Sequence, residues 1–199
     1  MTGGRIVVRA AEPGDGPGIG RVHVEAWRVG YAGIVPAEHL DSLDAEQRGR
    51  AWTERLAHPT RPCTLHGTGG LVVVAIIEPD RTEPVPGQPV IAGIANYGSY
   101  RRDESDASDG TDSTGMCELR MLNVHPDHWG TGVAQALMSR IIADLGRERG
   151  EPMVALWVLE DNARGRRFYE KEGWSPDGAR RAHRTGGVDL VVLRYVLPL

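Results

Sequence analysis

The short stretch around Gly130 and Gly132 carries the clearest chemical signal in the sequence. These glycines follow apolar residues that end at Val124, and Pro126 and Gly130 cannot continue a strand, so a strand should run into a tight turn and then a helix. A helix N-terminus presents free backbone N–H groups and a partial positive charge, and glycine lets a pyrophosphate approach the backbone closely. The turn could therefore bind phosphate, although a GxG pair alone is weak evidence because it can equally shape an ordinary turn.

The hydrophobic pattern around this turn alternates between strand and helix. The predicted elements of the C-terminal half are strands over 116–124 and 154–159, helices over 130–149 and 162–172, and a last strand over 188–196. Gly173 should end the second of these helices as a C-terminal cap. The turn with Gly130 and Gly132 thus joins a strand to a long helix.

The N-terminal half adds further strands and helices. We expect strands over 5–9, 71–77 and 90–97, a helix over 19–31, and a helical region that starts at Pro36, breaks near 41–44 and stops before Pro59. The acidic segment over 100–115 should be a mobile surface loop and not a domain boundary. The order of elements predicts an α/β (α+β) fold, in which a mixed sheet of about six to seven strands has helices on both faces.

Composition disfavours several other classes of protein. The 199 residues are 40% hydrophobic and 25% charged with a formal net charge of −4, which argues against binding nucleic acid through phosphate contacts. No run of about 18 apolar residues could span a membrane, and residues 1–9 do not resemble a secretory signal. Cys63 and Cys117 form no CxxC spacing, and the histidines form no HExxH spacing, so we expect no disulfide framework and no metal site. We expect a cytoplasmic protein.

The glycine turn and its flanking elements resemble the central motif of the GNAT superfamily of acetyl-CoA-dependent N-acetyltransferases. That motif is a strand, a turn of the form [QR]-x-x-G-x-[GA] and a helix. The corresponding residues here are Trp129, Gly130, Thr131, Gly132, Val133 and Ala134. Trp129 departs from the usual first residue of the family, which puts a side-chain contribution from that position in doubt.

A second block of residues resembles the same family. Residues 156–162, which end in Asn162, are followed by Phe168-Tyr169 and Gly173-Trp174, as in the family's strand, asparagine, helix and aromatic pair. Residues 9–15 and 27–31 also look like family N-termini. The resemblance covers essentially the whole chain and implies one N-acetyltransferase domain over 1–199, whose mostly antiparallel sheet splays between its two central parallel strands.

The resemblance implies direct transfer of an acetyl group from acetyl-CoA to a primary amine of a small-molecule, peptide or protein acceptor. The Leu122 N–H would face the thioester carbonyl and stabilise the oxyanion, and Val124 would lie along the pantetheine arm. The resemblance assigns cofactor binding to Leu122, Asn123, Val124, Trp129, Gly130, Thr131, Gly132, Val133, Ala134, Asn162 and Tyr169. The charge, hydropathy and residue spacing given above lead us to expect no metal, no membrane and no nucleic-acid partner, and the resemblance is compatible with a homodimer.

Two side chains are candidates for proton transfer within this resemblance. Glu118 stands where several family members carry a glutamate base, and the two-residue period of a strand should place Glu118, Arg120 and Leu122 on one face. Its alternative role is an ion pair with Arg120 or with a neighbouring strand. Tyr169 would protonate the departing thiolate, since a phenol has a pKa of about 10. Its alternative role is core packing beside Phe168.

Other assignments stay open on the sequence alone. Trp27 and Tyr31 lie four residues apart on one helical face, where they could line an acceptor pocket or pack in the core. Arg164 and its neighbours Arg166 and Arg167 could meet CoA phosphates or form a solvated helix face. The alternative to catalysis is a module that binds acetyl-CoA as a sensor without turning it over.

Overall fold

The computed structural model describes residues 4–58, 70–78, 90–101, 116–146 and 153–199. Several predictions fall outside these residues. They are the turn over 80–89, the acidic segment over 102–115, the environment of Cys63 and the last residues of the helix predicted to reach Arg149.

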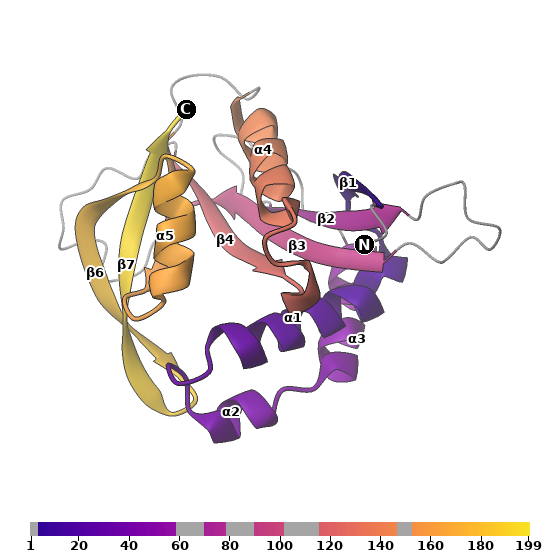
Figure 1. Cartoon of the computed structure of the whole chain (residues 1–199), viewed down its shortest axis with the longest axis horizontal. Coiled ribbons are helices and arrows are strands. Elements are labelled where there is room, and N and C mark those ends of the chain that lie inside the picture. The colour runs from indigo at the N-terminus through magenta and orange to yellow at the C-terminus, as the bar shows by residue number, and fades with distance from the viewer. Residues whose placement is uncertain (1–3, 59–69, 79–89, 102–115, 147–152) are drawn as a thin grey trace.

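The centre of the fold is a seven-stranded sheet in the order β1-β2-β3-β4-β5-β7-β6 (Figure 1). Its strands are β1 (Arg5–Ala10), β2 (Gly70–Glu78), β3 (Val90–Ser99), β4 (Cys117–Val124), β5 (Met153–Leu159), β6 (Ser175–Thr185) and β7 (Val188–Pro198). Neighbouring strands are antiparallel except for β4 and β5, which are parallel. The predicted mixed, mostly antiparallel sheet is confirmed.

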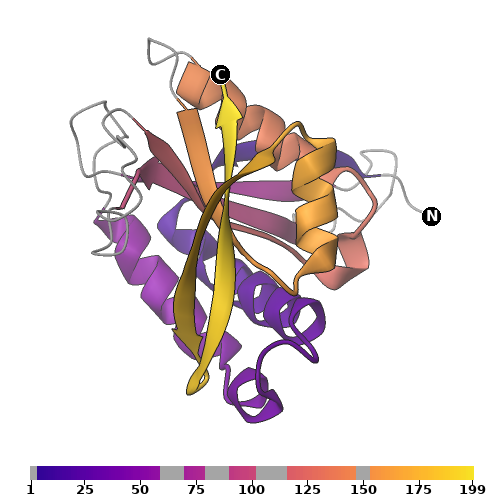
Figure 2. The same ribbon diagram turned by 90° about the vertical axis from the view of Figure 1, so that its left-hand side faces the viewer.

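Helices cover both faces of this sheet, as predicted (Figures 1 and 2). They are α1 (Gly16–Gly30), α2 (Ala37–Asp41), α3 (Ala45–Ala57), α4 (Val133–Gly146) and α5 (Ala163–Lys171). On one face, Ile19 and Val22 of α1 and Trp52 of α3 bury apolar surface against β2 and β3. On the other face, α4 and α5 pack against the central strands. Burial of these apolar faces is the main stabilising contribution to such a layered fold.

The predicted break between the second and third helices is confirmed. α2 ends at Asp41, and α3 begins at Ala45. The side chain of Asp44 caps α3 by accepting a hydrogen bond of 2.7 Å from the Gln47 N–H. The cap restarts the helix in a new direction, which places α3 against α1.

The two parallel strands separate soon after they begin. Pairing between β4 and β5 is limited to Cys117, Glu118 and Leu119 opposite Val154, Ala155 and Leu156. Beyond Leu119, β4 runs toward α1 and away from β7 (Figure 1). The predicted splay is therefore present, and no strand of the described ranges pairs with the β5-facing edge of the second half of β4.

An irregularity in β4 corrects one prediction. Met121 pairs with Asn96 and Leu119 pairs with Tyr97, so Arg120 is an extra residue, a β-bulge. Leu119 and Leu122 both pack on the face covered by α4, and this requires the bulge between them. Glu118 and Leu122 therefore lie on opposite faces. The prediction that Glu118, Arg120 and Leu122 share one face was wrong because the bulge resets the two-residue period.

Candidate active site

A cleft of about 460 Å³ opens where β4 and β5 separate. The segments that form most of its walls belong to two regions of the chain that are far apart in the sequence. They are the end of β4 (Leu122, Asn123, Val124), the glycine turn (His128, Trp129, Gly130, Gly132, Ala134), β5 (Trp157, Val158) and α5 with its cap (Asn162, Arg164, Gly165, Arg167, Phe168, Tyr169, Lys171). Ala26, Gly30 and Tyr31 close it from α1. Most of the residues predicted to bind a cofactor are brought together here.

The glycine turn leaves open space beside its backbone. Gly130 and Gly132 have φ angles of 77° and 93°, which L-residues with side chains rarely adopt. A Cβ on Gly130 would meet no atom within 4 Å, and one on Gly132 would meet only Ile6 Cδ1 at 3.9 Å. These backbone angles also explain why α4 starts at Val133 and not at Gly130 as predicted. The turn thus fits a phosphate group that approaches the main chain, which is the fit expected for CoA.

Two predicted members of the turn do not line the cleft with their side chains. The Thr131 hydroxyl donates to the His128 carbonyl at 2.8 Å and so stabilises the turn itself. Val133 is fully buried in the core beneath α4. Any contribution of these residues to a cofactor would therefore come from their backbone.

Asn162 caps α5 and borders the cleft at the same time. Its Oδ1 accepts a hydrogen bond of 2.9 Å from the Gly165 N–H. Asn162 and Tyr169 both line the cleft, in agreement with their predicted position on one face of α5. The Asn162 amide can therefore cap the helix with its oxygen and still offer its N–H₂ group to a ligand.

Tyr169 is held by other aromatic rings. Its ring meets Phe168 at 5.4 Å and Trp174 at 6.0 Å between centroids, in both cases edge to face. Burial raises the pKa of Tyr169 well above the usual value for a phenol, and the nearby Tyr31 raises it further. The Tyr169 hydroxyl is therefore a proton donor at every pH near neutrality and not a base.

The carboxylate of Glu118 interacts with two arginine side chains. Arg101 donates to it from Nη2 at 2.8 Å, from Nε at 3.0 Å and from its backbone N–H at 3.1 Å. Arg120 Nε lies 3.9 Å from Oε2. The Glu118 side chain is 4% exposed and is not among the residues that line the cleft. These contacts favour the ion-pair alternative over the role of a base, although the partner is mainly Arg101 and not Arg120.

A row of aromatic side chains runs along α1 to the cleft. His23 stacks on Trp27 at 5.7 Å, and Trp27 meets Tyr31 edge to face at 4.9 Å. Tyr31 lines the cleft, whereas Trp27 packs behind it against α2. Of the two predicted acceptor-pocket residues, the structure therefore brings only Tyr31 to the cleft.

Sequence reasoning missed Trp157 as a cleft residue. It lies in β5 between buried neighbours, and Arg181 of β6 stacks over its ring at 4.1 Å. Its Nε1 is buried without a hydrogen-bond partner among the described residues. The alternation of β5 could have indicated that Trp157 faces away from Leu156 and Val158, but nothing local shows that a cleft lies there.

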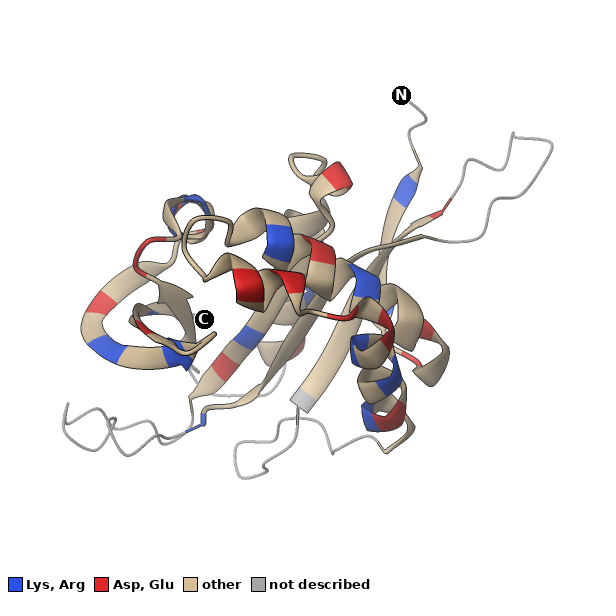
Figure 3. Ribbon diagram, turned by 90° about the horizontal axis from the view of Figure 1, so that it is seen from below, with Lys and Arg blue, Asp and Glu red and all other residues tan. Residues whose placement is uncertain are grey.

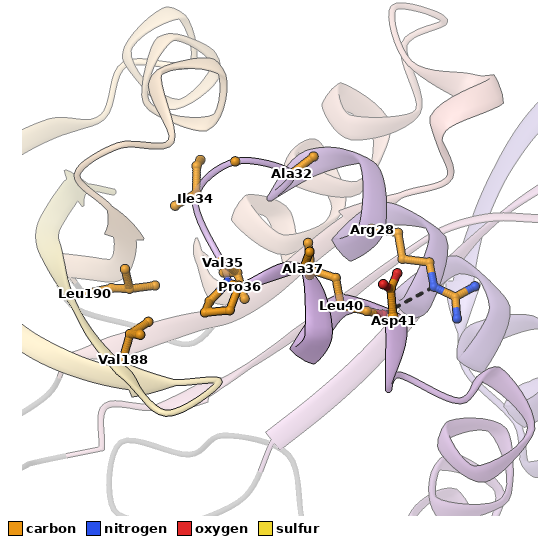
Figure 4. A pocket seen from close by; sticks show the side chains of 11 residues that line it. Arg28, Ala32, Ile34, Val35, Pro36, Ala37, Leu40, Asp41, Val188 and Leu190 are labelled. Atoms are coloured by element: carbon orange, nitrogen blue, oxygen red, sulfur yellow. Dashed lines mark hydrogen bonds between the residues drawn. The ribbon is translucent and has the colours of Figure 1, made fainter.

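The structure has a second cavity, of about 680 Å³ (Figure 4). Its walls are mostly apolar, with Ile34, Val35 and Pro36 opposite Val188 and Leu190 of β7. Arg28 and Asp41 lie at its far end. Consecutive residues line the two cavities, since Tyr31 lines the first and Ala32 lines the second.

Charge and metal-ligand patterns add little to the site. Basic and acidic positions are interspersed along the described elements seen in Figure 3. In the ranges that the structure describes, no group of three or more His, Cys, Asp or Glu side chains could hold a metal ion. No described helix is long and apolar enough to cross a membrane.

Comparison with known proteins agrees with this geometry. The model of the Acetyltransferase (GNAT) family matches residues 37–174. The uncharacterized N-acetyltransferase YuaI of Bacillus subtilis is 25% identical over 157 residues, which cover 79% of this chain and 73% of YuaI. A mycothiol acetyltransferase of Beutenbergia cavernae is 41% identical over 59 residues, which cover 30% of this chain and only 20% of that enzyme.

Solved structures show the same fold. A putative acetyltransferase, yncA, from Salmonella typhimurium, solved with its cofactor acetyl-CoA, has a TM-score of 0.61 at 19% identity over 98% of this chain and 94% of its own. The PaiA N-acetyltransferase of Thermoplasma acidophilum, in complex with coenzyme A, has a TM-score of 0.59 at 16% identity over 95% of this chain and 98% of its own. Because the family model matches more than half of its residues, the chain belongs to the GNAT acetyltransferase family.

Proposed function

We propose that this protein transfers the acetyl group of acetyl-CoA to a primary amine by direct attack in a ternary complex. The observation that carries the proposal is the cleft itself, in which the glycine turn, the unpaired edge of β4 and the Tyr169 hydroxyl meet. These are a phosphate-binding element, a row of backbone groups and a proton donor. Acetyl-CoA offers a pyrophosphate, an amide-bearing pantetheine arm and a thioester in the same order.

The edge of β4 supports the placement of the pantetheine arm. On the β5 side, its backbone groups after Leu119 pair with no strand in the part of the chain that the structure describes. Buried backbone groups need hydrogen-bond partners, and an amide-bearing chain laid along the edge would provide them. We expect Leu122, Asn123 and Val124 to contact this arm, with Asn162 holding it from α5.

The chemistry then needs three functions from the protein. The Leu122 N–H would stabilise the negative charge that develops on the thioester oxygen as the new C–N bond forms. When the C–S bond breaks, Tyr169 would donate a proton to the sulfur, the nitrogen of the new amide would release its extra proton to solvent, and Tyr169 would recover a proton from solvent. The ammonium proton of the acceptor must leave before attack, because an alkyl amine is protonated near neutral pH.

The identity of the base follows less directly from the structure. Glu118 is the predicted base, but both of its oxygens are bound by Arg101. Deprotonation of the amine by solvent before it enters the cleft requires no further residue. Glu118 remains the predicted base, and the pH–rate profile of Glu118→Gln tests that role.

The second cavity supports an acceptor site next to the thioester. An amine that passes Tyr31 to reach the cleft would leave the rest of its molecule near Ala32, where the apolar cavity begins. We expect this cavity to hold the part of the acceptor next to its amine.

We also expect a cytoplasmic enzyme, on the basis of its cysteine pattern, and the family resemblance is compatible with a homodimer.

The experiment is a release assay for free CoA thiol with acetyl-CoA and a panel of amines. The panel covers aminoglycosides, polyamines, amino acids, peptides with free N-termini and lysine-containing peptides. Acetyl-CoA should raise the melting temperature by mass action, with a binding free energy of roughly −7 to −9 kcal/mol. Stabilisation without thiol release on any amine would support the sensor alternative, and no stabilisation would refute acetyl-CoA binding.

A further inference from the structure

Arg164 and Trp129 form a contact that joins the two sides of the cleft. The Arg164 Cζ atom lies 3.1 Å from the centroid of the Trp129 ring. Trp129 belongs to the turn after β4, whereas Arg164 belongs to α5, which follows β5. The Trp129 ring is fixed in turn, because its Nε1 donates to the Val124 carbonyl at 2.8 Å.

The Arg164 guanidinium carries a charge that no acid neutralises within the described residues. It has neither a hydrogen bond nor an ion pair there, whereas Arg166 on the same helix donates to the Tyr195 hydroxyl and the Glu160 carbonyl. Arg164 is exposed, and the atoms packed against it lower its pKa through desolvation. An exposed guanidinium that lines the cleft and has no counter-ion among the described residues can pair with an anionic ligand there.

The rest of the cleft has the same sign of charge. Arg164, Arg167 and Lys171 line it, and the described residues that line it include no aspartate or glutamate. Basic and acidic positions are mixed along the other described elements (Figure 3). A cleft with cations alone attracts a polyanion, and CoA carries a pyrophosphate and a ribose phosphate.

Stacking on Trp129 leaves the guanidinium well placed for phosphate. The ring occupies one face of the planar group, so the N–H donors in its plane remain available for two parallel hydrogen bonds. Trp129 directly precedes Gly130, whose backbone opens into the cleft. The N–H groups of Arg164 and the amides of the glycine turn therefore border the same region.

We propose that Arg164, held in place by Trp129, binds the pyrophosphate of CoA. It would thereby add a side-chain donor from α5 to the backbone donors of the glycine turn. The inference rests on the proposed use of acetyl-CoA and adds a phosphate contact that spans the cleft. Arg164 and Trp129 would act as one unit, since the ring has no charge of its own and the guanidinium needs the ring for its position.

The test measures affinity by calorimetry for three ligands with Arg164→Gln and Trp129→Leu. Acetyl-CoA and its 3′-dephospho form both contain the pyrophosphate, and S-acetyl-pantetheine contains no phosphate. Arg164→Gln should weaken binding of the first two by the same factor, about 10- to 100-fold as for charged hydrogen bonds, and leave the third unchanged. The double variant should bind acetyl-CoA at most about 2-fold more weakly than Arg164→Gln alone, because the two residues form one unit.

A matched control exists in α3. Arg55 stacks on Trp52 at 5.0 Å, and neither residue lines the cleft. Arg55→Gln also removes an arginine that stacks on a tryptophan ring, and it should leave the affinities for all three ligands unchanged. Circular dichroism and the melting temperature of each variant show that it is folded at the temperature of the measurement.

The outcomes separate this inference from the proposed function. If the wild-type protein binds acetyl-CoA and Arg164→Gln binds it equally well, the inference is wrong and the proposed function stands. An equal loss for S-acetyl-pantetheine would overturn it too, and so would a loss confined to acetyl-CoA, which would place Arg164 at the 3′-phosphate. Absence of acetyl-CoA binding by the wild-type protein would refute the proposed function and the inference together.

Discussion

Glu118 and Leu122 lie on opposite faces of the central sheet although they belong to one strand and are four residues apart. The bulge at Arg120 separates their faces. Leu122 lines the cleft, whereas the Glu118 carboxylate is held by Arg101, which follows the end of β3. The structural relationship therefore bears directly on whether Glu118 can serve as the base.

We expect Glu118→Gln to reduce stability and to leave the shape of the pH–rate profile unchanged. The substitution removes the anion that neutralises Arg101 and the largely buried Arg120, and breaking such a pair costs up to about 3 kcal/mol when one partner is exposed. Thermal unfolding measures the loss of stability, and kcat/KM between pH 6 and 10 measures the profile. The affinity for acetyl-CoA should not change.

Arg101→Gln is the matched control for Glu118. It removes the other half of the ion pair and should destabilise the protein without altering the pH profile. A deficit in Glu118→Gln that shrinks toward high pH, where free amine becomes abundant, would show that Glu118 is the base after all.

The glycine turn gives a second prediction. Gly132→Leu should abolish most acetyl-CoA binding, because the side chain would enter the open space beside the turn. The residue has a φ of 93°, so the substitution also strains the backbone by about 1–2 kcal/mol. Calorimetric titration with acetyl-CoA measures the affinity, and thermal unfolding measures the strain.

A substitution at Gly178 distinguishes the loss of acetyl-CoA affinity from the backbone strain. Gly178 lies in β6, has the same φ of 93° and has no atom within 4 Å of an added Cβ. Gly178→Leu should therefore lose a similar amount of stability and keep its affinity for acetyl-CoA. If Gly132→Leu remains folded and binds acetyl-CoA normally, the phosphate-turn assignment has to be abandoned.

Local patterns predicted most of the elements that form the site. The apolar period of α1, the break before α3, and the two parallel strands on either side of α4 depend on residues close in sequence. β6 had no predicted range, because most of its residues are exposed and it pairs with one neighbour only. An edge strand of this kind lacks the apolar alternation by which strands are found.

Features that depend on distant residues could not be predicted from the sequence. The bulge at Arg120 is defined by its register with Asn96 and Tyr97, and no glycine marks it. The partner of Glu118 is Arg101, which the strand period does not place beside it. The contact between Trp129 and Arg164 joins two segments that only the splay of the sheet brings together.

The lowered pKa of His23 predicts how the stability of the protein depends on pH. Burial, and to a smaller extent the charge of Arg48, lower the pKa of His23 to about 4 from its usual 6.5. Between these values the unfolded chain binds the proton and the folded protein does not, so stability rises with pH through this window. Acidification from pH 6.5 to 4 should therefore cost up to about 3 kcal/mol from this residue, with no further loss below pH 4.

Denaturant unfolding at several pH values between 4 and 7 measures this slope. His23→Phe keeps a ring against Trp27 and removes the titrating group, so its slope should be shallower than that of the wild-type protein. His183→Gln, at an exposed position in β6, should retain the wild-type slope. Equal slopes for all three proteins would show that His23 is protonated as easily in the folded state as in the unfolded one.

Tyr169 gives the most direct test of the chemistry. Tyr169→Phe keeps the ring contacts with Phe168 and Trp174 and removes only the hydroxyl, so fold and acetyl-CoA affinity should be nearly unchanged. Turnover should fall by about 10²- to 10⁴-fold when departure of the thiolate limits the rate. Because burial raises the pKa of Tyr169, the wild-type enzyme should show no loss of rate from its ionisation up to about pH 10.

Tyr195 provides a second hydroxyl to delete as a comparison. It is fully buried, donates to Glu170 at 2.9 Å and does not line the cleft. Tyr195→Phe should therefore cost stability, about 1–2 kcal/mol for a lost buried hydrogen bond, and keep its turnover number. For Tyr169→Phe, the deficit should shrink with an acetyl thioester of a more acidic thiol, since that thiolate leaves without a proton. Full activity of Tyr169→Phe with acetyl-CoA would instead make Tyr169 a packing residue beside Phe168.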